Sequence, residues 1–223
     1  MRDVLYSGYE AQLANFRLVY SRTGCMVSMV LLLGGVALDY AFYPGEIYRF
    51  GAARIVTTLI SGGVLAMLYF RATRGRVRGL TMLWLSLPQI LIAWMIYETQ
   101  GAASPYVFGL SLALYAAGII MPIGFFQSIA LGVFTCLAYA IACYLHPTSN
   151  VSEFVGNSIF LLFSATISAG CTYFNERARI QLFRLQHEVS EKNTDLRKVN
   201  QALAEIKGHM VQQEKMAALG TLS

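Results

Sequence analysis

Apolar residues occupy most of the first three-quarters of the chain, in long runs that short polar segments separate. A helix needs about 20 mostly apolar residues to cross the ~30 Å hydrocarbon core of a bilayer. The runs cover residues 23–43, 52–70, 80–97, 105–145 and 154–174. The fourth run contains no charged residue and as one helix would be about 60 Å long, twice the length of one crossing. Pro122-Ile123-Gly124 lies at its middle and supplies a turn, so the pattern predicts six transmembrane helices within residues 23–174.

Residues 175–223 have a different hydrophobic period. Their apolar side chains alternate between three- and four-residue spacings, the pattern of a left-handed coiled coil, and Lys192 and Gln213 interrupt it as residues that fix register do. The apolar positions of the predicted dimer seam are Leu182, Leu185, Val189, Leu196, Val199, Leu203, Ile206 and Met210. The predicted fold class is an all-α membrane protein, with six transmembrane helices followed by a long cytoplasmic helix that forms a parallel coiled coil in a homodimer.

The sixth span and the coiled coil are predicted to form one helix. No proline separates Phe154 from Lys207, and Gly156 and Gly170 are the glycines before Lys207 in this stretch. Such a helix would carry rotation or translation from the membrane to whatever domain follows it. A plain dimerisation stalk without a signalling role is the alternative.

Residues 1–22 form a separate segment before the first span. Their apolar positions lie three and four residues apart, which predicts an amphipathic helix in the cytoplasmic membrane interface, with a frayed tail as the alternative. The segment contains acidic residues and has no apolar core of its own, so a signal peptide is not expected.

The composition agrees with a membrane protein, because 56% of the residues are hydrophobic and 13% are charged, against about 25% charged in soluble domains. The net charge of +5 does not predict a nucleic-acid partner, since the arginines lie at the ends of the apolar runs. Arg17 and Arg22, the four arginines of residues 71–79, and Arg177 and Arg179 all fall on one side of six alternating spans. This excess predicts that the arginine-rich side and both termini are cytoplasmic.

Few ionisable residues lie within the predicted spans. Asp39 and Arg54, near the outer ends of the first and second spans, either form an ion pair or reach separately to the lipid headgroups. No charged residue lies at the middle of a span, which disfavours an ion or proton transporter. The four cysteines lack metal-ligand spacing and the spans hold no paired histidines, so no metal or haem site is predicted.

Polar and aromatic residues near the third and fourth spans suit a small lipophilic ligand. Gln89 follows Pro88, whose ring leaves one backbone carbonyl without its helical partner, and the third span is therefore expected to bend around a cavity. Trp94, Tyr106 and Tyr115 would give that cavity aromatic walls with a few hydrogen-bonding groups.

The stretch EKMAALGTLS, Glu214–Ser223, resembles the segment just before the phospho-acceptor box of bacterial sensor histidine kinases. The resemblance implies a following domain with the acceptor histidine, an ATP-binding domain that uses ATP and Mg²⁺, and a response regulator or phosphotransfer protein as partner. His146, His187 and His209 lack the His-Glu-x-x-Asn-Pro pattern of the family, and no Gly-rich nucleotide loop is present. The 223 residues are therefore expected to bind no cofactor and to be non-catalytic.

A looser resemblance covers most of residues 1–180. HPTS (His146–Ser149), SGG in the second span and SAGCTYFNER (Ser168–Arg177) are similar to the six-span sensors of CqsS-type kinases, bacterial quorum-sensing receptors for long-chain α-hydroxyketones. The resemblance implies an inner-membrane location and ligand-selecting roles for Cys171 and Phe163. Tyr106 stands near the position of a family tryptophan, so head-group recognition is expected to differ.

The function predicted is the transmembrane sensor portion of a two-component histidine kinase, which binds a lipophilic, α-hydroxyketone-like autoinducer and signals through the sixth span and the coiled coil. One alternative is a kinase that senses lipid composition or membrane thickness without a ligand. A small transporter or scaffold is the other alternative. The predicted ligand-binding residues are Gln89, Trp94, Tyr106, Tyr115, Phe163 and Cys171.

Overall fold

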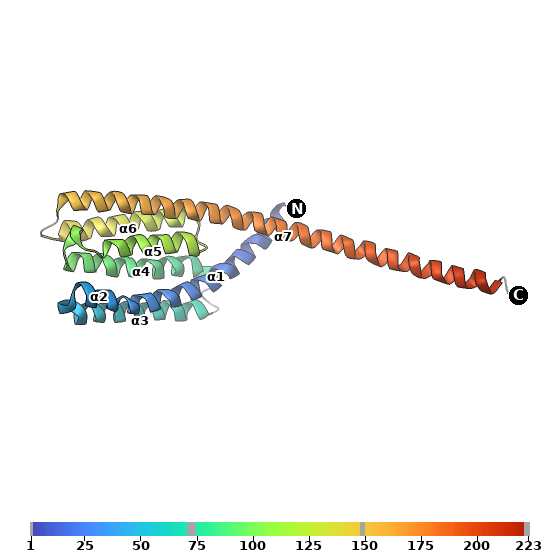
Figure 1. Cartoon of the computed structure of the whole chain (residues 1–223), viewed down its shortest axis with the longest axis horizontal. Coiled ribbons are helices and arrows are strands. Elements are labelled where there is room, and N and C mark those ends of the chain that lie inside the picture. The colour runs from blue at the N-terminus through green and yellow to red at the C-terminus, as the bar shows by residue number, and fades with distance from the viewer. Residues whose placement is uncertain (1, 71–74, 148–149, 221–223) are drawn as a thin grey trace. The chain divides into compact units, whose positions relative to one another are not determined.

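The computed structural model describes residues 2–70, 75–147 and 150–220, and its regular structure in these ranges is entirely helical (Figure 1). The prediction of an all-α fold is confirmed. The long helices are α1 (Arg2–Gly34), α3 (Ile47–Tyr69), α4 (Val77–Glu98), α5 (Val107–Ile120), α6 (Phe125–Leu145) and α7 (Val151–Gly220). The shorter elements are α2 (Val36–Phe42) and the 3₁₀ turns η1 (Pro44–Glu46) and η3 (Gly101–Ala103).

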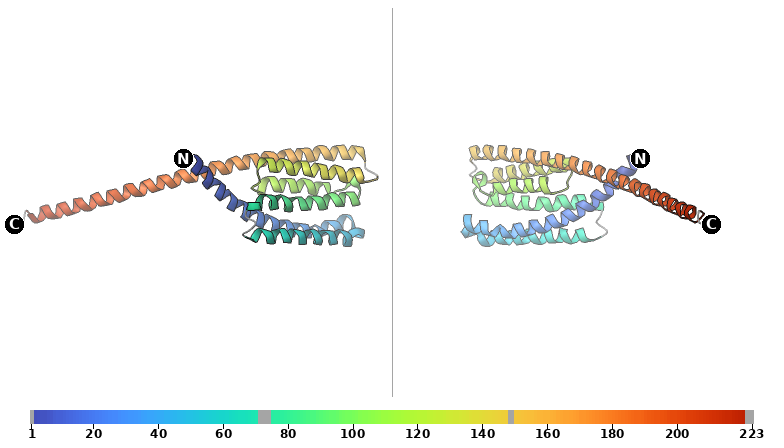
Figure 2. Two further views of the ribbon diagram at one scale, coloured as in Figure 1. Left: turned by 180° about the vertical axis from the view of Figure 1, so that it is seen from behind. Right: turned by 45° about the vertical axis from the view of Figure 1, so that its right-hand side comes forward.

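The chain divides into two compact units, Met1–Arg177 and Ala178–Ser223, and the boundary falls inside α7. In the first unit α4 is the central helix: it contacts α1 and α3 on one side and α5 and α6 on the other (Figures 1 and 2). The first part of α7 lies along α5 and α6, to which its side chains are hydrogen-bonded. The first unit is thus a helical bundle.

Within the residues that the structure describes, five stretches of helix are long and apolar enough to cross a membrane, judged by length and composition. They are Leu13–Phe42, Pro44–Tyr69, Val77–Glu98, Phe125–Leu145 and Val151–Gly208. The helix α5 has 14 residues, about 21 Å, and is shorter than the ~30 Å hydrocarbon core. Six complete crossings therefore remain a prediction.

The predicted turn between the fourth and fifth spans is present. α5 ends at Ile120 and α6 begins at Phe125, with Pro122-Ile123-Gly124 between them. α5 begins two residues after Pro105, where the predicted run starts, and the turn η3 lies before that run. Ser104, which precedes Pro105, has extended backbone with ψ 130°, as a residue before proline prefers, and the helix starts at Val107.

The segment 1–22 is not a separate helix. α1 continues from Arg2 to Gly34 without a break, and Leu13, Leu18 and Ser21 are buried against the bundle. The break occurs instead at Gly35, inside the predicted first span. A Cβ atom at Gly35 would lie 2.6 Å from the Arg54 Cζ atom, so a larger residue there would displace the Arg54 guanidinium.

Two apolar clusters fill the bundle. One, at the end formed by α2 and by the C-termini of α4 and α6, includes Phe50, Met95 and Leu110; we call this the far end. The other, at the arginine-rich end, includes Leu68, Trp84 and Leu131. The polar residues Ser111 of α5 and Gln89 of α4 fall between the two clusters in sequence and are buried. Their layer separates the two cores.

The second unit consists of the continuation of α7. The eight predicted seam residues of this segment are each 56–63% exposed in the single chain. Lys192, at a polar seam position, is 2.7 Å from Glu188, and this hydrogen bond and charge lower the pKa of the Glu188 carboxyl. The helical conformation of this segment is confirmed. The coiled coil stays a prediction, in which a second chain would bury the exposed apolar stripe.

Candidate functional site

Five polar side chains of α7 bind the hairpin formed by α5 and α6, and we call them the α7 anchor: Ser164, Ser168, Thr172, Asn175 and Glu176. Four of them recur at every fourth position, so they lie on one face of the helix. Ser164 Oγ is 3.0 Å from Tyr115 Oη, and Ser168 Oγ donates to the Leu114 carbonyl at 2.8 Å. In a lipid-embedded bundle such hydrogen bonds and close packing replace the hydrophobic effect between helices.

The last two residues of the anchor cap the ends of the hairpin helices. The final carbonyls of a helix and its first amides have no partner within the helix. Asn175 Nδ2 donates to the carbonyls of Gly118 and Ile119 at 3.3 and 3.0 Å, at the end of α5. Glu176 Oε2 accepts a hydrogen bond from Phe125 N at 3.3 Å, at the start of α6, where the helix dipole favours negative charge. α7 thus completes the α5–α6 turn.

Gly118 permits the closest approach between α5 and α7. A Cβ atom there would lie 2.6 Å from the Ser168 carbonyl oxygen and 2.8 Å from the Ser168 Cα. Both are backbone atoms, so relief would require that the two helices separate.

We expect Gly118→Ala to lower the free energy of unfolding by about 1–3 kcal/mol, the usual cost of overpacking. Unfolding of the purified protein in detergent, followed by circular dichroism, measures it. Gly63→Ala is the matched control, because a Cβ at Gly63 meets nothing within 4 Å. It should be neutral or slightly stabilising, since alanine favours helix. Equal stability of the two variants would contradict the close contact.

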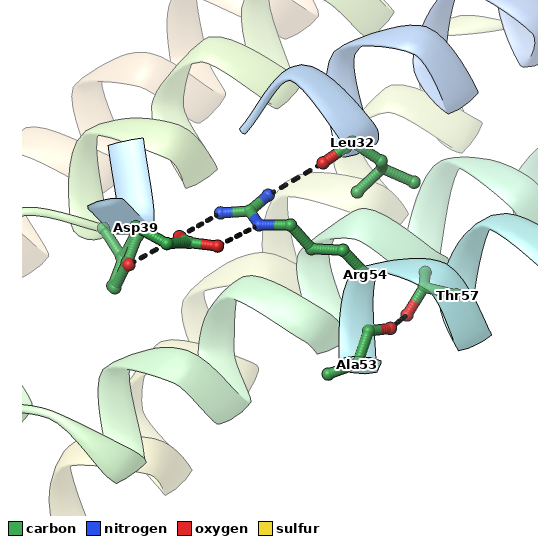
Figure 3. A network of polar contacts seen from close by, with 6 residues as sticks. Leu32, Asp39, Ala53, Arg54 and Thr57 are labelled. Carbon is green, nitrogen blue, oxygen red and sulfur yellow. Dashed lines mark hydrogen bonds and ion pairs between the residues drawn. The ribbon is translucent and has the colours of Figure 1, made fainter. Parts of the chain in front are cut away.

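A buried charge cluster lies at the far end. Arg54 donates through Nε and Nη2 to the two carboxylate oxygens of Asp39, both at 2.7 Å. Its third nitrogen donates to the Leu32 carbonyl at 3.2 Å, so the guanidinium bridges Asp39 and α1 (Figure 3). Tyr106 Oη donates to Asp39 Oδ1 at 2.7 Å. Asp39 is 0% exposed and Arg54 5%. The sequence allowed either an Asp39–Arg54 ion pair or separate contacts of the two side chains with lipid headgroups, and the structure contains the ion pair. With its hydrogen-bond partners, the pair joins α1, α2, α3 and the start of α5.

Aromatic rings cover this charge cluster. The Tyr43 ring stacks on Tyr106 at 5.6 Å between centroids, and Phe50 meets both Tyr106 and Trp94 edge-on at 6.0 and 5.9 Å. Arg49 lies over Trp94, and its guanidinium is 2.8 Å from Glu98. The apolar rings keep water away from the buried ion pair, which strengthens its electrostatic attraction.

The polar layer between the two cores has unused hydrogen-bonding capacity. Thr135 Oγ1 is hydrogen-bonded to Gln89 Oε1 and also to the Leu131 carbonyl. Gln89 Nε2 and Ser111 Oγ are buried and have no hydrogen-bond partner in the part of the chain that the structure describes. Buried polar atoms are normally paired, so these two could serve a polar ligand atom.

The six residues predicted to bind a ligand do not meet in one place. Tyr106 and Trp94 both contact Phe50 at the far end, while Gln89 binds Thr135 and Tyr115 binds Ser164. Cys171 is half-buried, and Phe163 is 63% exposed on the outside of the bundle. A cavity lies at the arginine-rich end, and none of the six residues lines it. α4 continues as one helix through Pro88.

Sequence reasoning missed the α7 anchor. The available signal was the four-residue repeat of small polar residues, Ser164, Ser168 and Thr172, together with the facing Gly118. Such small-residue repeats mark close helix contacts in membranes.

Among the described residues, no group of three or more His, Cys, Asp or Glu side chains could hold a metal ion.

Comparison with known families finds a match over most of the chain. The model of the MASE8 family, a membrane-associated sensory domain, matches residues 37–190. The match extends from α2 through the bundle and into the second unit. No curated protein matches the chain, and no solved structure does.

Proposed function

The chain belongs to the MASE8 family of membrane-associated sensory domains, and on this premise we propose that it is the sensor region of a dimeric histidine kinase of the bacterial inner membrane. Its signal is a small lipophilic molecule of the α-hydroxyketone type, used in quorum sensing. The kinase output rests on the resemblance of Glu214–Ser223 to the segment before a phospho-acceptor box.

The observation that carries the proposal is the extent of α7. The helix runs from Val151 to Gly220, so one element carries both the anchor and the exposed apolar stripe. The α7 anchor binds the hairpin through hydrogen bonds. In an apolar bundle its side chains would find few other polar partners. A signal that repacks α5 and α6 would change those bonds and thereby displace the helix that enters the dimer seam.

The ligand chemistry is supported by the unused groups of the polar layer. Gln89 Nε2 and Ser111 Oγ offer hydrogen bonds to a ketone oxygen or a hydroxyl, while the surrounding core suits an alkyl chain. Binding shifts the sensor between states to the extent that the ligand has different affinities for them. A shift from 1:99 to 99:1 requires an affinity ratio of about 10⁴.

The test is autophosphorylation of the full-length protein in membrane vesicles, with and without long-chain α-hydroxyketones. We expect the added ketone to change the initial rate of labelling by tenfold or more. The variant Ser168→Ala/Asn175→Ala should keep basal labelling and lose most of the response, because it lacks three hydrogen bonds to α5.

Thr166→Ala is the matched control for this experiment. Thr166 is also on α7, but it is exposed and its hydroxyl is bonded to the Leu162 carbonyl of its own helix. It should respond as the natural protein does. Absence of labelling would contradict the kinase assignment, and equal responses of the control and the anchor variant would contradict transmission through α7.

A second function, sensing of the membrane itself, is favoured by a different observation. Leu162, Phe163 and Ile167 expose more than half of their surface on α7, where lipid would contact them. Bilayer thickness would then act directly on the anchored helix. Labelling that follows the acyl-chain length of the vesicle lipid, and not added ketone, would favour this function.

A further inference from the structure

The heptad repeat of the apolar stripe on α7 continues back into the bundle. Counted in steps of seven along the sequence, the positions before Leu182 and Leu185 are Ala178, Asn175, Cys171, Ser168, Ser164 and Leu161. α7 is one continuous helix through all of them. These residues therefore hold the a and d positions, the seam positions of each heptad, in the same repeat that predicts the coiled coil.

Within the bundle, the α5–α6 hairpin covers these seam positions. Leu161, Ser164 and Ser168 are buried, and Cys171 and Asn175 are half-buried. The positions on the opposite side of the repeat, Ile159, Thr166 and Tyr173, are exposed. The seam positions from Leu182 onward are each 56–63% exposed. One heptad repeat thus makes an intramolecular contact in its first part and leaves an apolar surface open in its second part.

The side chains at the covered seam positions would suit a contact with a second helix as well as one with the hairpin. Ser164, Ser168 and Cys171 are small, and small residues let two helices approach closely in a membrane. Ser164 Oγ also donates to the Phe160 carbonyl at 2.9 Å, and Thr172 Oγ1 donates to the Ser168 carbonyl at 2.9 Å. Both bonds lie within α7, so these two hydroxyls would stay paired if the hairpin moved away.

Asn175 is the residue whose partner would have to change. Its side-chain amide donates to the Gly118 and Ile119 carbonyls of α5. Asparagine at an a position of a parallel coiled coil fixes the register of the two chains, and Asn175 of the partner subunit would offer the same amide chemistry. The two α5 carbonyls lie at a helix end, where water can replace a lost partner. The hydrogen bonds of Asn175 can therefore be exchanged.

We infer that the seam positions from Ser168 to Ala178 are a second docking surface for another copy of this chain, used in exchange for the α5–α6 hairpin. The inference rests on the dimer of the proposed function. While the hairpin holds these residues, the coiled coil begins after Ala178. When the hairpin releases them, the seam lengthens towards the membrane and Asn175 pairs with Asn175 of the partner subunit. A signal that loosens the contact between α5 and α7 would thus lengthen the coiled coil.

The experiment is disulfide cross-linking of the full-length protein in membrane vesicles, with Cys171 kept as the single cysteine. Cysteines at matching d positions of a parallel pair face each other across the seam, so an oxidant should link the two chains in the lengthened state. Asn175→Val should raise the cross-linked fraction about fivefold, the effect of one net hydrogen bond on an equilibrium. Valine cannot bond the α5 carbonyls, and it suits an a position.

A second variant weakens the same contact from the side of the hairpin. A Cβ atom at Gly118 would lie 2.6 Å from the Ser168 carbonyl oxygen, so Gly118→Ala should also raise cross-linking at Cys171. Gly63→Ala is its matched control, because a Cβ there meets nothing within 4 Å. Asn193→Val is the matched control for Asn175→Val, since Asn193 is exposed and outside the seam positions. Both controls should leave the cross-linked fraction unchanged.

A cysteine on the opposite side of the repeat measures random collision. Thr166→Cys/Cys171→Ser should cross-link little, with or without Asn175→Val. Equal cross-linking at positions 166 and 171 would overturn the inference, and so would a Cys171 signal that neither Asn175→Val nor Gly118→Ala raises.

A cysteine in the exposed stripe separates this inference from the proposed dimer. Val199→Cys/Cys171→Ser places the single cysteine at a d position of the stripe and should cross-link whether or not the hairpin holds α7. Cross-linking at position 199 without a response at Cys171 would overturn the exchange and leave the dimer standing. Absence of cross-linking at both positions would overturn the dimer and the exchange together.

Discussion

Replacement of Arg54 by methionine is expected to lower the free energy of unfolding by about 3–5 kcal/mol, because it leaves the Asp39 carboxylate buried without its counter-ion. Asp39 would keep one hydrogen bond, from Tyr106. Desolvation of a carboxylate costs far more than one neutral hydrogen bond returns. Stepwise unfolding of the purified protein in mixed micelles, followed by circular dichroism, measures the loss.

Two variants control this prediction. Arg49→Met breaks an ion pair at the same end, but Arg49 is 54% exposed, so the expected cost is below about 1 kcal/mol. Asp39→Leu/Arg54→Met/Tyr106→Phe removes all three polar partners and should recover stability to within about 1 kcal/mol of the natural chain, because a well-packed apolar replacement of a buried pair is often neutral. If Arg54→Met costs no more than Arg49→Met, the buried pair contributes little to the fold.

The second large effect is expected in the seam. Leu196→Asp/Leu203→Asp would place two carboxylates from each chain in the interface, at a cost of several kcal/mol for each unpaired buried charge. The proposed dimer should dissociate into monomers while α7 stays largely helical. Light scattering of the protein–detergent complex, corrected for bound detergent, should show half the protein mass.

Thr194→Asp/Gln201→Asp is the control for charge alone. These exposed residues lie five positions after Val189 and Leu196, on the face of the helix away from the stripe. The control should remain dimeric. Dissociation of both variants would point to general charge repulsion, and a dimer in the seam variant would show that the bundle and not the stripe holds the copies together.

The sequence determined those features that depend on neighbours along the chain. Helical runs, the α5–α6 break at Pro122-Ile123-Gly124 and the apolar stripe of α7 follow from local periodicity and proline chemistry, and the structure contains each of them. The local pattern did not determine the lengths of the helices or the residues at which they begin and end. It did not show that α5 would be only about 21 Å long, and it ended the first segment at residue 22, where α1 continues without a break.

Tertiary structure decided which side chains meet. Asp39 and Arg54 are 15 residues apart, and Tyr106 is another 52 beyond Arg54, so no local spacing could show that one carboxylate binds both. The same holds for Phe163, which the bundle turns outward, and for Asn175 and Glu176, which cap helices more than 50 residues earlier. In a bundle whose helices are apolar on all faces, composition does not say which face is buried. The few small and polar residues decide the packing, and their partners are fixed by geometry in three dimensions.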